Sequence, residues 1–309
     1  NPAASMRMAL GEAITNMAGG VIAGLNNVQG SANWMAASGE NNDDAALRYG
    51  VEALSKISVD LNVSIPVGKD SLSMRTKWSE KNDELEVSSP LSGIITAMAP
   101  VEDVSVAVTP ELNLDEDTTI LLIKLDENNR LAGSIFSEIT ESKYENTPDI
   151  EDTKKFNNLF TSIQGLVKDQ QILSMHDISD GGLITSLLEM CFTKKVGMTL
   201  NLDSVSDINS FLFSEEIGFV IQVKDDDKTE VISILKKDDF FVKEIAKITD
   251  KDFLIVNNER NIFKESIIKL EKIWRETSHA IQALRDNKEI ADAELSLLED
   301  KDHIGLQSN

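Results

Sequence analysis

Residues 119–125 read TILLIKL, a short run in which nearly every side chain is apolar. A strand of this kind is buried on both faces, so helices must cover both sides of its sheet. Helical and strand patterns then alternate along the chain. The predicted helices span residues 150–169, 182–193 and 227–236, and the predicted strands span residues 198–202, 218–223 and 253–256. This alternation predicts an α/β layer domain over residues 117–260.

A second, smaller unit precedes this domain. Met6, Leu10, Ile14 and Met17 recur at helical spacing, and a similar apolar stripe runs through residues 43–61. Runs rich in strand-forming residues follow, separated by Gly, Pro and charged turns. These predicted strands span residues 64–67, 72–78 and 91–98. The pattern predicts a small mixed α/β unit.

The polar, acidic sequence TPELNLDEDT separates the two units and places the boundary near residue 116. The N-terminal domain is therefore predicted over residues 1–116. Residues 261–309 carry apolar side chains at helical spacing among many charges, which predicts a helical connector starting near residue 262. We expect an α/β (α+β) chain of two domains followed by this connector.

The excess of acidic residues excludes some classes of binding partner for this chain. With 53 acidic and 30 basic residues, the formal net charge is −23, so a long polyanion such as DNA would be repelled. A nucleotide can still bind, because Lys side chains, backbone amides and Mg²⁺ neutralise phosphate locally. The single cysteine, Cys191, lies in an apolar run, excludes an internal disulfide and fits a reducing cytoplasm. No run of eighteen apolar residues is present, so no membrane span is expected.

The sequence IPVGKDSLSM places Gly68, Lys69, Asp70 and Ser71 between two predicted strands. A tight loop there would present an ammonium, a carboxylate and a hydroxyl together, which suits a phosphate with Mg²⁺. The first glycine of a Walker loop is missing, however. A plain hairpin turn with solvated charges explains the same residues.

The sequence HDISDGGL precedes an apolar helix. Asp180 is the predicted N-cap, the two glycines allow a ligand close to the backbone, and the helix N-terminus favours negative charge. Asp177 would then be available to a metal. An ordinary strand-to-helix turn with a capping aspartate remains the alternative.

Glu12 and Asn16 lie four residues apart and therefore share one face of the first helix. Carboxylate and amide oxygens are ligands that Mg²⁺ prefers, so the pair could hold this ion. A solvated polar face is the alternative. The histidines are scattered without zinc spacing, and no Ser-His-Asp or Cys-His set is present, so no catalytic residue is named.

Taken together, GEAITN, SANWMAA, IPVGKDSLSM, HDISDGGL and WRETSHAIQALRDN resemble, in order and spacing, the second synthetase repeat of the large phosphoribosylformylglycinamidine synthases. The resemblance spans nearly the whole chain. It implies a two-domain unit of the aminoimidazole ribonucleotide synthetase type. It also implies part of a ligase of purine biosynthesis that converts formylglycinamide ribonucleotide, ATP and glutamine into the amidine.

The resemblance also implies roles for particular residues. Glu12, Asn16 and Asp177 match the Mg²⁺ ligands of the auxiliary nucleotide site, in which this family holds Mg-ADP as a structural element, and Lys69 and Ser179 match its nucleotide contacts. The catalytic nucleotide loop and the glutaminase cysteine belong to other parts of the enzyme. We therefore expect an internal piece that is inactive alone and has the first synthetase repeat and the glutaminase domain as partners.

Two other readings stay open. The chain could be a structural module that binds no nucleotide until it is assembled. It could instead belong to another synthetase of the superfamily, such as aminoimidazole ribonucleotide synthetase, selenophosphate synthetase or a hydrogenase maturation factor. The strand-rich face of the first domain would expose apolar surface without a partner repeat, so we also expect self-association.

Overall fold

The computed structural model describes residues 1–39, 42–81, 83–115 and 117–300. Within them, the largest sheet has seven strands, and β8 (Thr118–Lys124) lies inside it. The strand order is β14 (Arg260–Ser266), β13 (Asp252–Asn257), β10 (Gly197–Asn201), β12 (Phe241–Thr249), β8, β11 (Gly218–Lys224) and β9 (Ser174–Asp177). The β10–β13 pair is parallel and the other pairs are antiparallel.

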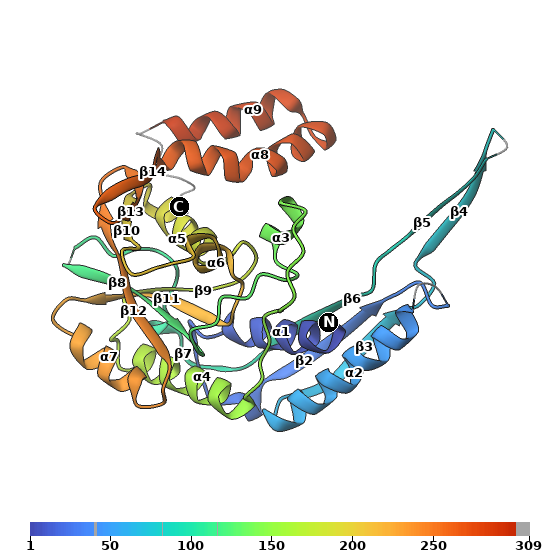
Figure 1. The fold of residues 1–309 in the computed structure, drawn as a ribbon, viewed down its shortest axis with the longest axis horizontal. Helices are drawn as coiled ribbons and strands as arrows, with labels where there is room; N and C mark the ends of the chain where they lie inside the picture. Colours follow the sequence, from blue (N-terminus) through green and yellow to red (C-terminus); the bar gives the residue numbers. More distant parts are fainter. Residues whose placement is uncertain (40–41, 82, 116, 301–309) are drawn as a thin grey trace.

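Strand β8 is buried along its whole length, as its apolar sequence predicts. Leu121 and Ile123 join the core under α4 (Thr153–Lys168) and α7 (Lys228–Lys236), whereas Ile120 and Leu122 join the core under α5 (Gly182–Lys194), α6 (Ile208–Phe213) and α8 (Ile267–Arg285). Helices thus cover both faces of the sheet (Figure 1). The predicted α/β fold is confirmed.

The N-terminal part pairs two helices with small sheets. Helices α1 (Pro2–Thr15) and α2 (Asp43–Asp60) pack on a three-stranded sheet ordered β3 (Ser64–Ser71), β2 (Gln29–Met35) and β6 (Ser92–Met98). Strand β1 (Val21–Ile22) pairs with β7 (Val101–Asp103). Strands β4 (Arg75–Glu80) and β5 (Asp83–Ser88) form a hairpin that projects from the molecule (Figure 1).

One apolar core joins the N-terminal helices to the large sheet. Leu10 and Ile14 of α1 lie in the same cluster as Phe156 and Ile163 of α4. Gln164 adds polar contacts across this junction: its Oε1 accepts from the amide of Ile22 at 2.8 Å, and its Nε2 donates to the carbonyls of Ala18 and Gly20 at 2.8 and 3.0 Å. The position of α1 against the large sheet is therefore fixed, and this matters for the site described below.

The start of the predicted connector is wrong. Residues 262–266 belong to β14, which pairs with β13 through a tight turn where Asn258 and Glu259 both have positive φ, 49° and 60°. The helical part begins at Ile267 with α8 and continues with α9 (Lys288–Ser296). Residues 301–309 of the predicted connector lie outside the described residues. No helix in the described part of the chain is both long and apolar enough to cross a bilayer.

Candidate functional site

The turn from β9 to α5 brings Asp177, Ser179 and Asp180 to one edge of the large sheet. Its geometry requires glycine, because Gly182 has a φ of 73° and a Cβ there would lie 2.7 Å from the carbonyl carbon of Phe213. The N-cap of α5 is Gly181, in the left-handed conformation and without a side-chain cap. The predicted cap Asp180 is therefore wrong. The close approach of the 213–214 backbone sets the position of the helix start, and it leaves the Asp180 side chain exposed.

Helix α1 presents the two polar residues singled out in the sequence. Glu12 is half-buried, and Asn16 is exposed at the C-terminal end of the helix. The Nδ2 of Asn16 donates to the carbonyl oxygen of Glu12 at 3.1 Å, which turns the amide and leaves its Oδ1 as an acceptor. Glu12 lines the cavity described below, whereas Asn16 and Asp177 are not among the described residues that line it.

A cavity of about 490 Å³ lies between these elements, and we call it the α1–α5 cavity. Glu12, Ser179, Asp180 and Glu215 line one side, with Ser5 and Met8 of α1. The opposite wall consists of residues from the segment between β8 and α4. These are Ala132, Gly133, Tyr144, Glu145, Thr147 and Pro148. The cavity therefore joins parts of the chain that are far apart in sequence.

Negative charge accumulates in this cavity. Burial raises the pKa of Glu12, and the nearby carboxylates of Asp180, Asp177 and Glu215 raise it further. Burial also raises the pKa of Glu215, although hydrogen bonds from the amides of Gly181 and Ile135 offset part of that effect. Among the described residues that line the cavity, none is Lys, Arg or His. An anionic ligand would therefore need a cation to accompany it.

The oxygen donors fit such a cation only in part. In the described part of the chain, no three His, Cys, Asp or Glu side chains converge on one point as a metal site. Glu12 and Asp177 would need the Oδ1 of Asn16, water or ligand oxygens to complete an octahedral shell. Mg²⁺ usually retains several waters and binds one or two carboxylates together with phosphate oxygens, so this incomplete set suits it.

Asp177 is held by its neighbours. The hydroxyl of Thr15 lies 3.4 Å from its Oδ2, and His176 Nδ1 lies 3.4 Å from its Oδ1. The His176 ring is placed to donate to the Asp177 carbonyl at 2.7 Å and to Glu189 at 2.8 Å. Burial lowers the pKa of His176, but these hydrogen bonds outweigh burial and raise it to about 10. A charged imidazole thus supports the strand end that carries Asp177.

Lys69 does not lie with these residues. It belongs to β3 and not to the predicted loop, and its register places it beside Asn33 of β2, which in turn pairs with Ile94. Residues that pair directly across a sheet share one face, so Lys69 and Ile94 lie on the same face. The opposite face, which carries Gly93 and Trp34, packs on Met6 of α1. Lys69 lines a separate hollow along β3, and its Nζ donates to the Ser71 hydroxyl at 2.8 Å. Lys69 and Ser179 therefore line two different hollows of this chain.

Two protein-family models match this chain. Residues 1–100 match the FGAR-AT PurM_N-like domain, and residues 116–257 match the C-terminal domain of AIR synthase related proteins. Both matches follow the architecture above, a small helix-and-sheet unit followed by a larger layered one. The chain has the PurM-like synthetase fold.

Solved structures share this PurM-like fold. Thermotoga maritima PurL complexed with FGAR superimposes with a TM-score of 0.65 at 11% identity, covering 87% of this chain and 43% of that one. The complex of the same PurL with ATP gives 0.63 at 11%, covering 86% and 41%. The hydrogenase maturation protein HypE gives 0.59 at 13%, covering 84% and 82%. This chain spans about two fifths of the PurL chains.

Two residues that shape the site of this PurM-like unit were not predicted from the sequence. Glu215 and Glu216 precede β11, and together they contact the β9–α5 turn and the opposite cavity wall. The available signal was two acidic residues directly before the apolar run IGFVIQV, but two carboxylates exposed to solvent would give the same pattern. Cys191 is completely buried, and burial raises its thiol pKa to about 12, so the thiol stays protonated near neutral pH.

Proposed function

We propose that this chain is the second synthetase unit of a large-type phosphoribosylformylglycinamidine synthase, the ATP- and glutamine-dependent ligase that forms formylglycinamidine ribonucleotide. The match of residues 1–100 to an FGAR-AT family model carries the proposal. The fold alone would fit a hydrogenase maturation protein equally well, since HypE covers a similar share of the chain. The N-terminal match favours the synthase over the maturation protein. The first synthetase repeat and a glutaminase would be its partners.

Within that enzyme, we propose that the α1–α5 cavity is the auxiliary Mg-ADP site. Glu12, Asn16 and Asp177 would bind Mg²⁺, and Ser179 at the β9–α5 turn would contact phosphate. The support is the excess of carboxylates without a lining cation, together with oxygen donors suited to Mg²⁺. Lys69 remains a predicted nucleotide contact, on a sheet face that a second synthetase unit would cover. Catalytic residues are assigned to the partner repeat and the glutaminase.

Substituting Glu12 by Gln tests the metal role with two readouts of opposite sign. Removing a half-buried carboxylate that lies near other carboxylates should leave the thermal stability of the ligand-free protein unchanged or higher. The same change should weaken Mg-ADP binding by at least about tenfold, or roughly 1.4 kcal/mol. Calorimetric titration with Mg-ADP and thermal melts measure the two effects, and Asp177→Asn should weaken binding likewise.

Glu52→Gln is the matched control, because Glu52 lies on the α2 surface and pairs with Arg48 at 2.9 Å. It should leave Mg-ADP affinity unchanged. Equal affinities for the wild type, Glu12→Gln and Asp177→Asn would refute the site. If the chain alone binds nothing and gains Mg-ADP binding only when the first synthetase repeat is added, the structural-module reading is favoured.

A further inference from the structure

The wall opposite Glu12 belongs to a loop that closes on itself. The segment 126–151, which we call the cover loop, contains the short helix α3 (Ile135–Ile139). The amide of Ala132 donates to the carbonyl of Asn146 at 3.1 Å, so the two ends of the inner loop meet. Phe136 stacks on Phe213 of α6 with ring centroids 4.7 Å apart. The cover loop is thus closed at its neck and packs against α6.

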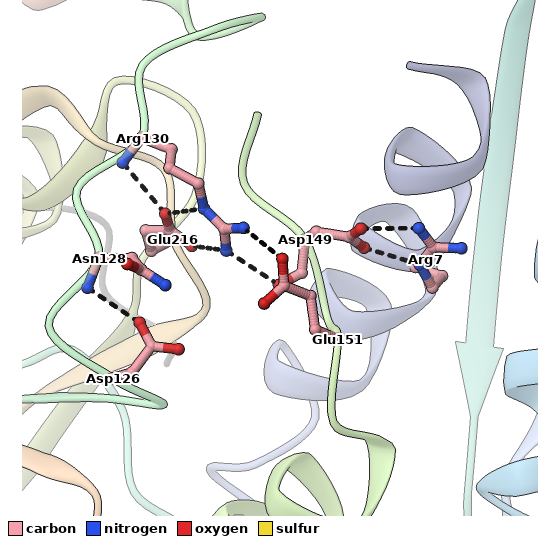
Figure 2. Close-up of polar contacts among 7 residues, drawn as sticks. All are labelled: Arg7, Asp126, Asn128, Arg130, Asp149, Glu151 and Glu216. Atoms are coloured by element: carbon pink, nitrogen blue, oxygen red, sulfur yellow. Dashed lines mark hydrogen bonds and ion pairs between the residues drawn. The ribbon is translucent and has the colours of Figure 1, made fainter. Parts of the chain in front are cut away.

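Ion pairs fix the cover loop from two sides. Arg130 makes a bidentate pair with the nearly buried Glu216, at 2.7 and 2.9 Å, and its amide donates to the same carboxylate at 3.1 Å. At the other end, Asp149 accepts two bonds of 2.7 Å from Arg7 of α1. Figure 2 shows the two arginines on either side of the segment that carries Asp149 and Glu151. Both anchors are bidentate, the geometry in which Arg–carboxylate pairs are strongest.

Glu215 ties the cover loop to the phosphate side of the cavity. Its Oε1 accepts from the amide of Ile135 in the cover loop and from the amide of Gly181 in the β9–α5 turn, both at 2.9 Å. One carboxylate therefore sets the spacing between the two walls. A wall fixed before the ligand arrives loses little entropy on binding.

The two walls differ in chemistry. The wall formed by α1 and the β9–α5 turn carries Glu12, Ser179 and Asp180, and the cover loop contributes Ala132, Tyr144 and Pro148. Tyr144 supplies the aromatic ring among the described residues that line this cavity. An aromatic face can stack on any nucleobase, and one such contact changes affinity by roughly fivefold to a hundredfold.

We propose that the cover loop is the base-binding wall of the α1–α5 cavity and that the ring of Tyr144 stacks on the nucleobase. The inference rests on the proposed nucleotide site and adds an orientation to it. The diphosphate with its metal lies by Ser179, and the base lies by Tyr144. The direction follows from the cation: Glu12 lies with Ser179 on the wall formed by α1 and the β9–α5 turn, so Mg²⁺ and the phosphates that it accompanies belong at that end.

The test compares two probes that share the diphosphate and differ in the base, Mg-ADP and Mg-pyrophosphate. Tyr144→Ala should weaken Mg-ADP binding at least about fivefold and leave Mg-pyrophosphate binding within about twofold. Tyr144→Phe keeps the ring and should bind Mg-ADP like the wild type. Tyr49→Ala is the matched control, since Tyr49 is 59% exposed on α2, and it should change neither affinity.

The outcomes separate the two proposals. A wild-type chain that binds neither probe refutes the proposed site, and the base wall with it. A wild-type chain that binds both probes while Tyr144→Ala leaves Mg-ADP affinity unchanged, or weakens both probes equally, overturns the base wall and keeps the site. Circular dichroism and thermal melts confirm that Tyr144→Ala remains folded, as expected for a side chain that is 40% exposed.

Discussion

His176 is the residue whose protonation the structure controls most clearly. Its folded pKa, about 10, lies above the ordinary value of 6.5, so the folded state binds the proton more tightly. The resulting stabilisation is complete below pH 6.5 and is lost as the pH rises towards 10. We therefore expect the melting temperature to fall between pH 7 and pH 10, and we expect His176→Gln to flatten that slope.

Thermal melts at several pH values measure this slope, and His279→Gln on the exposed α8–α9 hairpin is the control that should leave it unchanged. Equal slopes for the wild type and His176→Gln would contradict the assignment.

The sequence could single out Asp177, because a strand, a polar turn and two glycines surround it. It could not supply Glu189 as the partner of His176, because that pairing depends on how α5 packs beside β9.

At the scale of elements, glycine decides where α5 can start. Gly182→Ala would place a methyl group within 3 Å of three backbone atoms at residues 212–214, in a positive-φ conformation that alanine resists. We expect a loss of roughly 2–4 kcal/mol, seen as a lower urea midpoint. Gly165→Ala is the opposite case, since Gly165 lies exposed in α4 with open space around its Cβ, and it should gain about 0.5–1 kcal/mol. An unchanged urea midpoint for Gly182→Ala would refute the predicted backbone constraint.

Elements with strong periodicity could be predicted closely. The helix expected over residues 43–61 is α2 (Asp43–Asp60), and the strand expected over residues 218–223 is β11 (Gly218–Lys224). The four-residue β9 is too short to give a pattern, and β12 mixes Lys and Glu with apolar residues along its length. The cover loop could not be foreseen at all, because its anchors join residues as distant as Arg130 and Glu216.

The whole molecule places an open apolar surface next to a polar site. On the three-stranded sheet, Val67, Ile94 and Met98 are 61%, 52% and 60% exposed, and their register turns them away from α1. The outer strands β3 and β6 each have one neighbour among the described strands, so their other edges are open. An open face and open edges of this kind favour pairing with another sheet.

We therefore expect the isolated chain to self-associate through this sheet. Ile94→Lys combined with Met98→Lys should weaken association at least about tenfold, because it places two charges on the contact face, whereas Val59→Lys on α2, at a 73% exposed valine, should not. Sedimentation velocity over a concentration series measures the effect. Since each chain carries a net charge of −23, added salt should strengthen association by screening repulsion between copies. A monodisperse monomer at every concentration and salt would show that this face needs no partner.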